Sequence, residues 1–428
     1  MNRVYCLVAL LVLALPAAAA TTAIVGGKVH TVGPQGTIEN ATVLIVDDRI
    51  AAVGTDVDIP AGAETIDASG KIVTPGLFSP YGQLGLAEVS SSAGPTDYSQ
   101  RGEQFTAGFD IADAYNARST LIPVNRIEGV TRAVVAPSPG YPDESGHGHI
   151  LAGLAAIVNL GNDDVMDRRA AALVVVLGEG GAAFSGGTRT AAWLTLRNSL
   201  NEALDYREHK GDFERGMRRD YTHSMTDLDA LQGVINGNTP MLVNIHRASD
   251  IEVLIDLVNE YSLSAIITGG SEAWMLADEL AAARIPVIVG PTANLPGGFD
   301  RINARLGTAS ILIKAGVKVA IADSDAQTHN ARNITQSAGN AVANGLDWDA
   351  ALRAITLSPA EIFGMAAMTG SLEAGKAADV VIWPGDPLEL TNYPEAVFIN
   401  GVAVPMESRQ TMLRDRYLQT EKPPAYRD

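Results

Sequence analysis

The sequence predicts an α/β fold in which repeated β/α units are flanked by β-rich segments at both ends. Three observations support this prediction. Between Pro75 and Phe363, short apolar runs of strand character alternate with longer stretches of helical periodicity. From Thr22 to Val73 the runs are short, β-like and broken by Gly, Pro and Asp, and β character returns after Met368. Because the last segment is too short to form a core alone, we expect it to complete a small sheet with the first.

Seven strand candidates are visible in the central region, at 72–77, 131–136, 171–177, 241–246, 265–268, 286–289 and 318–322. An eighth lies within 150–160, where the pattern does not separate a further strand of the sheet from a decorating hairpin. Helical partners are expected at 189–206, 250–261, 272–283, 337–344 and 348–355. This alternation is typical of β/α units arranged around a parallel sheet.

Composition and charge exclude several classes of function. The chain has 428 residues, of which 46% are hydrophobic and 19% charged, so it can bury a large core. Lys and Arg number 31 against 49 Asp and Glu, which gives a net charge of −18. A field of this sign repels phosphate backbones and anionic lipid surfaces. Nucleic-acid binding is therefore excluded as the main function.

Residues 1–20 have the pattern of a secretory signal peptide. Arg3 gives a short basic start, an apolar run covers 4–15, and a run of alanines precedes Thr21. The run is too short to span a membrane. We expect cleavage before Thr21, a periplasmic or extracellular location, and no membrane insertion of the mature chain. Cys6 is the only cysteine in the sequence and leaves with the signal, so no mature thiol is available as a ligand or nucleophile.

Two motifs at the ends of the central region resemble those of a known family. They are IVTPGL at 72–77 and GSLEAGKAADVV at 370–381, and together they resemble the two ends of an amidohydrolase-superfamily barrel. The runs NIHRASDI at 244–251 and NARN at 330–333 are most similar to imidazolonepropionase-like exported members. The resemblance implies a TIM-type (β/α)8 barrel over 74–367 and a composite β-sandwich built from 21–73 and 368–410. The remainder, 411–428, is expected to be a polar surface tail.

The resemblance also implies a metal-assisted hydrolysis, and the expected ligands can be checked position by position. A catalytic zinc needs about three protein ligands and an open position. Tyr81 and Gln83 stand where the family has His-x-His, and the run at 268–270 is Thr-Gly-Gly where a further histidine is expected. His246 is present at a strand end, and the family's aspartate corresponds to Asp325, with Asp323 as the alternative.

His246 and Asp325 are therefore the predicted catalytic residues and the predicted ligands of one divalent ion, with zinc the expected metal; the alternative is no ion at all. Tyr81, Gln83, Arg247, His329 and Arg332 are the predicted substrate-binding residues. An arginine there could hold a substrate carboxylate by paired hydrogen bonds. Surface ion pairs remain the alternative for both arginines, and packing remains the alternative for Tyr81.

His147 and His149 form a second His-x-His in a glycine-rich stretch. Residues i and i+2 of an extended strand face the same side, which suits two ligands. The pair follows the second strand candidate, however, where the family has no metal ligands. A structural or solvent-exposed pair is the alternative to a ligand pair, and the sequence favours that alternative.

The resemblance implies hydrolysis of a C–N bond in an amide, a lactam or a small peptide. The alternative is a metal-free pseudoenzyme that binds a small ligand or partners an active paralogue. A third hypothesis is metal-free hydrolysis with Asp325 as general base. The expected partner is a small molecule, and a homo-oligomer or a hetero-oligomer with a paralogous amidohydrolase is also expected.

Overall fold

The computed structural model describes residues 20–89, 94, 96–99, 105–139, 148–217, 220–322 and 329–418. The predictions that fall on 1–19, His147, Asp323, Asp325 and the end of the tail lie outside the described residues.

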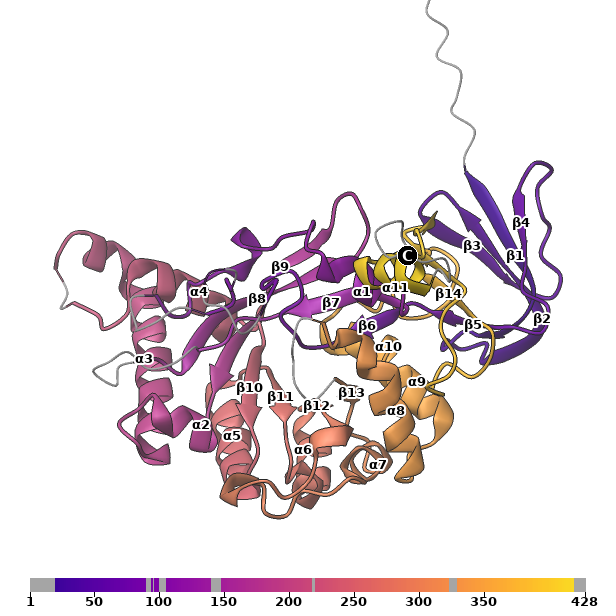
Figure 1. The fold of residues 1–428 in the computed structure, drawn as a ribbon. Helices are drawn as coiled ribbons and strands as arrows, with labels where there is room; N and C mark the ends of the chain where they lie inside the picture. The colour runs from indigo at the N-terminus through magenta and orange to yellow at the C-terminus, as the bar shows by residue number, and fades with distance from the viewer. Residues whose placement is uncertain are drawn as a thin grey trace, which may run out of the picture.

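The predicted barrel is present as a sheet of eight strands that curls until it is nearly closed (Figure 1). Its neighbours run in the order β13-β12-β11-β10-β9-β8-β7-β6. The strands are β6 (Leu77–Ser79), β7 (Val130–Val135), β8 (Leu151–Asn159), β9 (Met166–Val176), β10 (Met241–Ile245), β11 (Ala265–Gly269), β12 (Val287–Val289) and β13 (Val319–Ile321). Helix α10 (Leu357–Ile362) contacts both end strands, β6 and β13, and so covers the gap between them.

Strand β8 settles the question left open at 150–160. It lies inside the sheet, antiparallel to both β7 and β9, while the other neighbouring strands are parallel. The alternative of a hairpin that decorates the barrel is therefore wrong. Strands β8 and β9 do form a hairpin, but it is part of the barrel sheet. The physical reason is the short connection at 160–165, since a parallel crossover needs a dozen or more residues.

The strands are buried on both faces, which explains their nearly continuous apolar sequences. Side chains that alternate along β9 to β12, such as Val174, Leu242, Ile266 and Ile288, pack together inside the barrel. Their neighbours in sequence pack outward in the cluster that contains the helices. The helices of this layer are α2 (Gly178–Ala183), α3 (Arg189–Glu214), α4 (Met225–Ile235), α5 (Ala248–Tyr261), α6 (Ala277–Ala283), α7 (Thr308–Lys314), α8 (Ile334–Ala343) and α9 (Trp348–Ala354).

A second sheet combines the two ends of the chain. Its order is β16-β15-β14-β5-β1-β2-β3, with β4 paired to β1. The strands are β1 (Thr21–His30), β2 (Thr37–Val46), β3 (Arg49–Gly54), β4 (Glu64–Asp67), β5 (Ile72–Pro75), β14 (Val380–Trp383), β15 (Ala396–Ile399) and β16 (Val402–Ala403). Since β5 pairs with β1 on one side and β14 on the other, the C-terminal strands complete the N-terminal sheet.

The first strand candidate, 72–77, is divided between the two sheets, which corrects its assignment to the barrel alone. Residues Ile72–Pro75 belong to the composite sheet as β5, and the barrel strand β6 begins at Leu77. Gly76 marks the division. A Cβ atom at this position would lie 2.2 Å from Thr131 Oγ1, so only glycine allows the close approach of β7.

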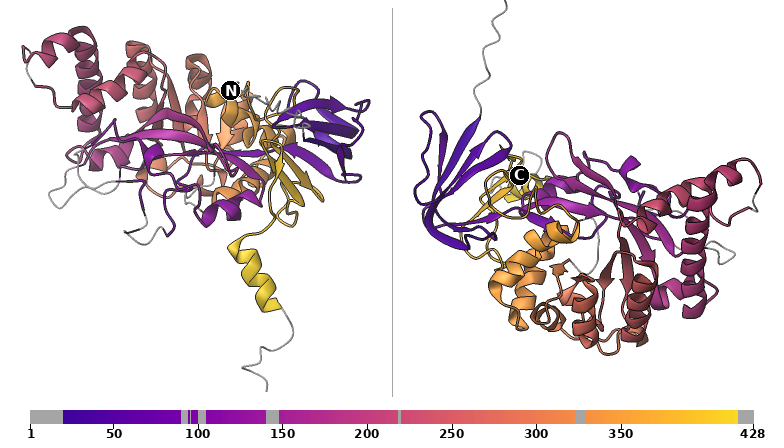
Figure 2. Two further views of the ribbon diagram at one scale, coloured as in Figure 1. Left: turned by 90° about the horizontal axis from the view of Figure 1, so that it is seen from above. Right: turned by 180° about the vertical axis from the view of Figure 1, so that it is seen from behind.

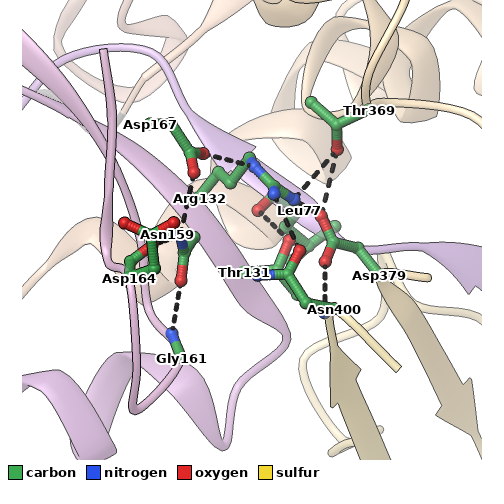
Figure 3. A network of polar contacts seen from close by, with 10 residues as sticks. All are labelled: Leu77, Thr131, Arg132, Asn159, Gly161, Asp164, Asp167, Thr369, Asp379 and Asn400. Atoms are coloured by element: carbon green, nitrogen blue, oxygen red, sulfur yellow. Dashed lines mark hydrogen bonds and ion pairs between the residues drawn. The ribbon is translucent and has the colours of Figure 1, made fainter. Parts of the chain in front are cut away.

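A buried polar network joins the two sheets (Figure 3). Arg132 on β7 is 2% exposed, and its guanidinium forms an ion pair with Asp379 of the C-terminal segment. Its Nε donates to Asp167 Oδ2 on β9 at 2.6 Å, and Nη2 donates to Asn400 Oδ1 at 3.0 Å. Thr369 Oγ1 donates to Asp379 Oδ2 at 3.0 Å. The charge of Arg132 is thus neutralised by residues from both structural units.

The predicted polar tail begins as a helix. Helix α11 (Arg409–Leu418) has no buried residues and projects from the body of the molecule (Figure 2). Across the described part of the chain, none of the helices combines the length and apolar character needed to cross a membrane.

Candidate active-site pocket

A cavity of about 290 Å³ opens where the barrel strands end. Its wall is formed by residues at or just beyond the carboxyl ends of β6, β10, β11, β12 and β13. The lining residues are Tyr81, Asn244, His246, Thr268, Gly269, Ser271, Ile288, Val289, Gly290, Ala293, Asn294, Arg301 and Ala322. Active sites of TIM-type barrels lie at this end of the strands.

His246 follows the last residue of β10 and lines the cavity. One ring nitrogen, Nδ1, is hydrogen-bonded to Ser271 Oγ at 2.8 Å, which fixes the orientation of the ring. Burial, reinforced by the cation of Arg301 and opposed by the carboxylate of Asp300, lowers the pKa of His246 to about 4. The imidazole is therefore neutral at pH 7.

Gly269 explains why the further histidine expected at 268–270 is missing. Its φ is +91°, a conformation that side chains other than glycine rarely adopt. A Cβ atom there would lie 2.5 Å from Cε1 of His246. The ring of His246 thus occupies the space into which a side chain at this position would extend.

Of the two residues at the first His-x-His position, one reaches the cavity. Tyr81 lines it together with His246, and burial raises the pKa of the Tyr81 phenol, which stays protonated. Gln83 is half-buried and is not among the lining residues. Its backbone carbonyl accepts a hydrogen bond from Leu86 N–H. The structure therefore brings Tyr81 and His246 together and leaves Gln83 aside.

The other predicted substrate-binding residues are not among those that line the cavity. Arg247 is exposed and lines a neighbouring depression with Phe299. Arg332 lines a third depression, and its backbone N–H donates to Asn125 Oδ1 at 2.9 Å. His329 is described and half-buried. Contacts of these three residues with a substrate remain predictions.

Sequence reasoning missed five polar lining residues, Asn244, Thr268, Ser271, Asn294 and Arg301. Asn244 and Thr268 are register partners on β10 and β11, and their places at strand ends were a usable signal. Arg301 lies in a short 3-10 helix at Phe299–Arg301, well beyond β12, and its sequence surroundings read as a turn.

The second His-x-His is represented by His149 alone, because His147 lies outside the described residues. Nδ1 of His149 accepts a hydrogen bond from Leu151 N–H at 3.0 Å, and its ring lies 5.3 Å from that of His223. Burial, with the neighbouring His223, lowers the pKa of His149 to about 4. His149 is not a lining residue of the cavity, and the ligand role of the pair remains untested.

The described residues do not fit the metal centre that the resemblance implies. Within the described ranges, no three His, Cys, Asp or Glu side chains converge on one point. The cavity wall contributes one imidazole, and Tyr81 is a protonated phenol. The predicted pair of His246 and Asp325 stays a prediction.

Comparisons with known proteins agree with this architecture. Residues 209–413 match the model of the amidohydrolase family. Amidohydrolase tasK of Hapsidospora irregularis is 22% identical over 400 residues, covering 86% of this chain and 39% of that protein. The imidazolonepropionase of Geobacillus sp. (strain WCH70) is 49% identical over 51 residues, which are 10% of this chain and 12% of that protein. The chain thus spans well under half the length of these relatives.

Solved structures show the same fold. An amidohydrolase from Thermotoga maritima MSB8 superposes with a TM-score of 0.79 at 23% identity, covering 91% of this chain and all (100%) of that one. Phenylurea hydrolase B gives a TM-score of 0.53 at 18% identity, with coverage of 94% and 100%. Residues 209–413 thus match the amidohydrolase family, the described chain shares the fold of these solved structures, and a stretch of 51 residues resembles an imidazolonepropionase.

Proposed function

We propose that the protein hydrolyses a C–N bond of a small amide or lactam in the strand-end cavity. The observation that carries this proposal is that Tyr81 and His246, from the ends of two different barrel strands, line one cavity. The family match and the names of two similar structures, phenylurea hydrolase B and molinate hydrolase, support hydrolysis as the type of reaction.

His246 supplies an oriented, neutral imidazole. If Nδ1 donates its proton to Ser271, Nε2 keeps a lone pair that can accept a proton or bind a cation. Tyr81, as a protonated phenol, can donate a hydrogen bond to a carbonyl oxygen. Asp325 is the proposed proton carrier of the reaction. One divalent ion on His246 and Asp325, with zinc the expected metal, is also part of the proposal.

The test is a hydrolysis assay on a panel of lactams, hydantoins and N-acyl amino acids, with zinc content measured on the same dialysed samples. We expect His246→Ala to lower turnover at least about 100-fold, the order of loss seen when one acid–base or electrostatic contributor is removed. His209→Ala, on the outer helix α3, is the control and should keep full activity. Equal activity of wild type and His246→Ala would refute the role of the cavity.

A second function, binding without turnover, is favoured by one observation. A general base works best with a pKa near the operating pH, and a pKa of about 4 makes His246 a weak proton acceptor at pH 7. If panel compounds bind the wild-type protein and none is hydrolysed in zinc-loaded samples, the pseudoenzyme alternative replaces the hydrolase.

A further inference from the structure

We propose that the cavity selects small amides that carry a negative charge, with Arg301 binding the anionic group and Asn244 binding the edge of the amide. This inference rests on the proposed function and adds to it the chemical class of the ligand. It assigns a specificity role to two residues that the sequence did not single out.

The cavity wall contains polar side chains that lack protein partners among the described residues. They are the hydroxyl of Tyr81, the carboxamide of Asn244, the hydroxyl of Thr268 and the guanidinium of Arg301. Thr268 is only 6% exposed, and Asn294 Oδ1 in the same wall is a buried acceptor without a hydrogen-bond partner among the described residues. Because a polar group buried without a partner costs free energy, such a set indicates a polar ligand.

Asn244 and Thr268 stand side by side. They are register partners on the parallel strands β10 and β11, so their side chains lie on the same face, about 4.8 Å apart along the hydrogen-bonding direction. That face is the barrel interior, where Leu242 and Ile266, two residues earlier, also pack. A carboxamide offers one acceptor and two donors, so Asn244 can pair with the C=O and N–H of a lactam.

Arg301 is held beside His246 by anchors on both sides in the sequence. Asp300, which is 7% exposed, accepts a hydrogen bond from Arg189 on α3. Asn303 donates through its backbone and side-chain nitrogens to Glu272 Oε1, both at 3.0 Å. The segment between these anchors carries Arg301 into the cavity wall, so the guanidinium is positioned before a ligand arrives.

The charge of Arg301 stands out in its surroundings. The protein carries a net charge of −18, yet no described lining residue is acidic. Arg301 has no ion pair among the described residues, whereas Arg189, at the start of α3, is paired with Asp250 and with Asp300, the residue before Arg301. A lone guanidinium in a recessed site is the group that binds a carboxylate through two parallel hydrogen bonds.

The test measures binding by titration calorimetry with four small probes that separate charge from amide. 5-Oxoproline carries a lactam and a carboxylate, 5-oxoprolinamide has the same shape without the charge, 2-pyrrolidinone keeps the lactam alone, and cyclopentanecarboxylate keeps the carboxylate alone. We expect 5-oxoproline to bind at least about 10-fold more tightly than each of the other three, since a charge-assisted hydrogen bond contributes more than a neutral one.

Two variants and a control assign this preference to residues. Arg301→Gln should weaken 5-oxoproline about 10- to 100-fold and leave 5-oxoprolinamide nearly unchanged. Asn244→Leu should weaken all three lactam probes and leave cyclopentanecarboxylate unchanged. Arg305→Gln is the control: it removes an exposed cation that lies over the ring of Trp274, outside the cavity. Melting temperatures of all three variants verify that they fold.

Charged and neutral lactams that bind equally to the wild-type protein would overturn the inference, as would an equal loss in Arg305→Gln or no binding of any probe. These outcomes are distinct from failure of the proposed function. Hydrolysis of neutral amides without a preference for charge would refute the inference alone. Selective binding of charged lactams without turnover of any panel compound would refute hydrolysis alone.

Discussion

Arg132 is the residue on which the junction of the two sheets depends most. Its guanidinium contacts Asp167, Asp379 and Asn400, and both it and Asp379 are at most 3% exposed. The aspartate of the ADVV motif at 378–381 thus has a structural role, because it neutralises a buried cation. Removal of one partner leaves the other charge buried and uncompensated, which is far more costly than loss of a surface pair.

We predict that Asp379→Asn lowers the free energy of unfolding by about 3 to 5 kcal/mol, because Arg132 then keeps its charge with one counter-ion fewer. Urea denaturation followed by tryptophan fluorescence measures the change. Asp113→Asn is the matched control, because it removes one partner of the half-exposed Arg169 and should cost at most about 1 kcal/mol. Equal losses in the two variants would contradict the role of the network.

His149 gives the stability a defined pH dependence. Its pKa is about 4 in the folded protein and near its ordinary value of 6.5 in the unfolded chain. Between these values the unfolded chain binds the proton more readily, so stability is complete above about pH 6.5 and falls as the pH is lowered toward 4. The full shift corresponds to at most about 3 kcal/mol.

We therefore predict that His149→Gln flattens the decline of stability between pH 6.5 and pH 4, because a group that no longer titrates cannot contribute to it. Urea midpoints at half-unit pH steps measure the slope. His209→Gln, on α3, serves as the control. Superimposable profiles for wild type and His149→Gln would show that this histidine is protonated equally in both states.

At the scale of elements, the end of β11 packs directly against the ring of His246, which leaves no room for a side chain at Gly269. A methyl group on Gly269 would meet the ring at 2.5 Å, and its φ of +91° is strained for alanine. We predict that Gly269→Ala destabilises the protein by about 2 kcal/mol or more, combining strain and overpacking. Denaturant unfolding of the variant measures this loss.

A double-mutant cycle separates the two causes. His246→Ala removes the ring, so Gly269→Ala should be less costly in that background by about 1 kcal/mol or more, while the backbone strain remains. Strictly additive losses would mean that the ring and the glycine do not contact each other, contrary to the structure.

The sequence predicted the elements whose periodicity is set locally, and missed what depends on distant contacts. Alternating apolar runs located β7 and β9 to β13, because buried parallel strands are apolar on both faces. The direction of β8 depends on the length of the turn at 160–165 rather than on its own pattern. The division of 72–77 depends on Gly76, which must be glycine because a side chain on β7 leaves no room for a Cβ atom there.

The same distinction applies to the candidate site. His246 was predictable, because the carboxyl ends of parallel strands gather at one edge and a polar residue there is conspicuous. Arg301 was not, since its place in the cavity depends on the contact of Asp300 with Arg189 on a distant helix. Arg332 lies within the NARN motif at 330–333 that resembles the family, yet it lines a different depression.

At the scale of the whole molecule, export remains a prediction that can be tested directly. The basic start, the short apolar run and the small residues before Thr21 predict cleavage after Ala20. We expect N-terminal sequencing of the protein from the periplasm or medium to begin at Thr21. Ala18→Leu, which enlarges a small residue of the cleavage site, should retain the signal. An intact Met1 on the wild-type protein recovered outside the cytoplasm would contradict the prediction.

The composite sheet also has a consequence in time. Two hydrogen-bond partners of Arg132 are synthesised much later than Arg132 itself, since Thr369 follows it by 237 residues and Asn400 by 268. At about 5 to 20 residues per second, this delay is on the order of 10 to 50 seconds. During that interval Arg132 has Asp167 but not Asp379 as a counter-ion, and β5 lacks its neighbour β14. The nascent chain can therefore complete the junction of the two sheets only when translation has almost ended. A chain that is interrupted earlier lacks this junction.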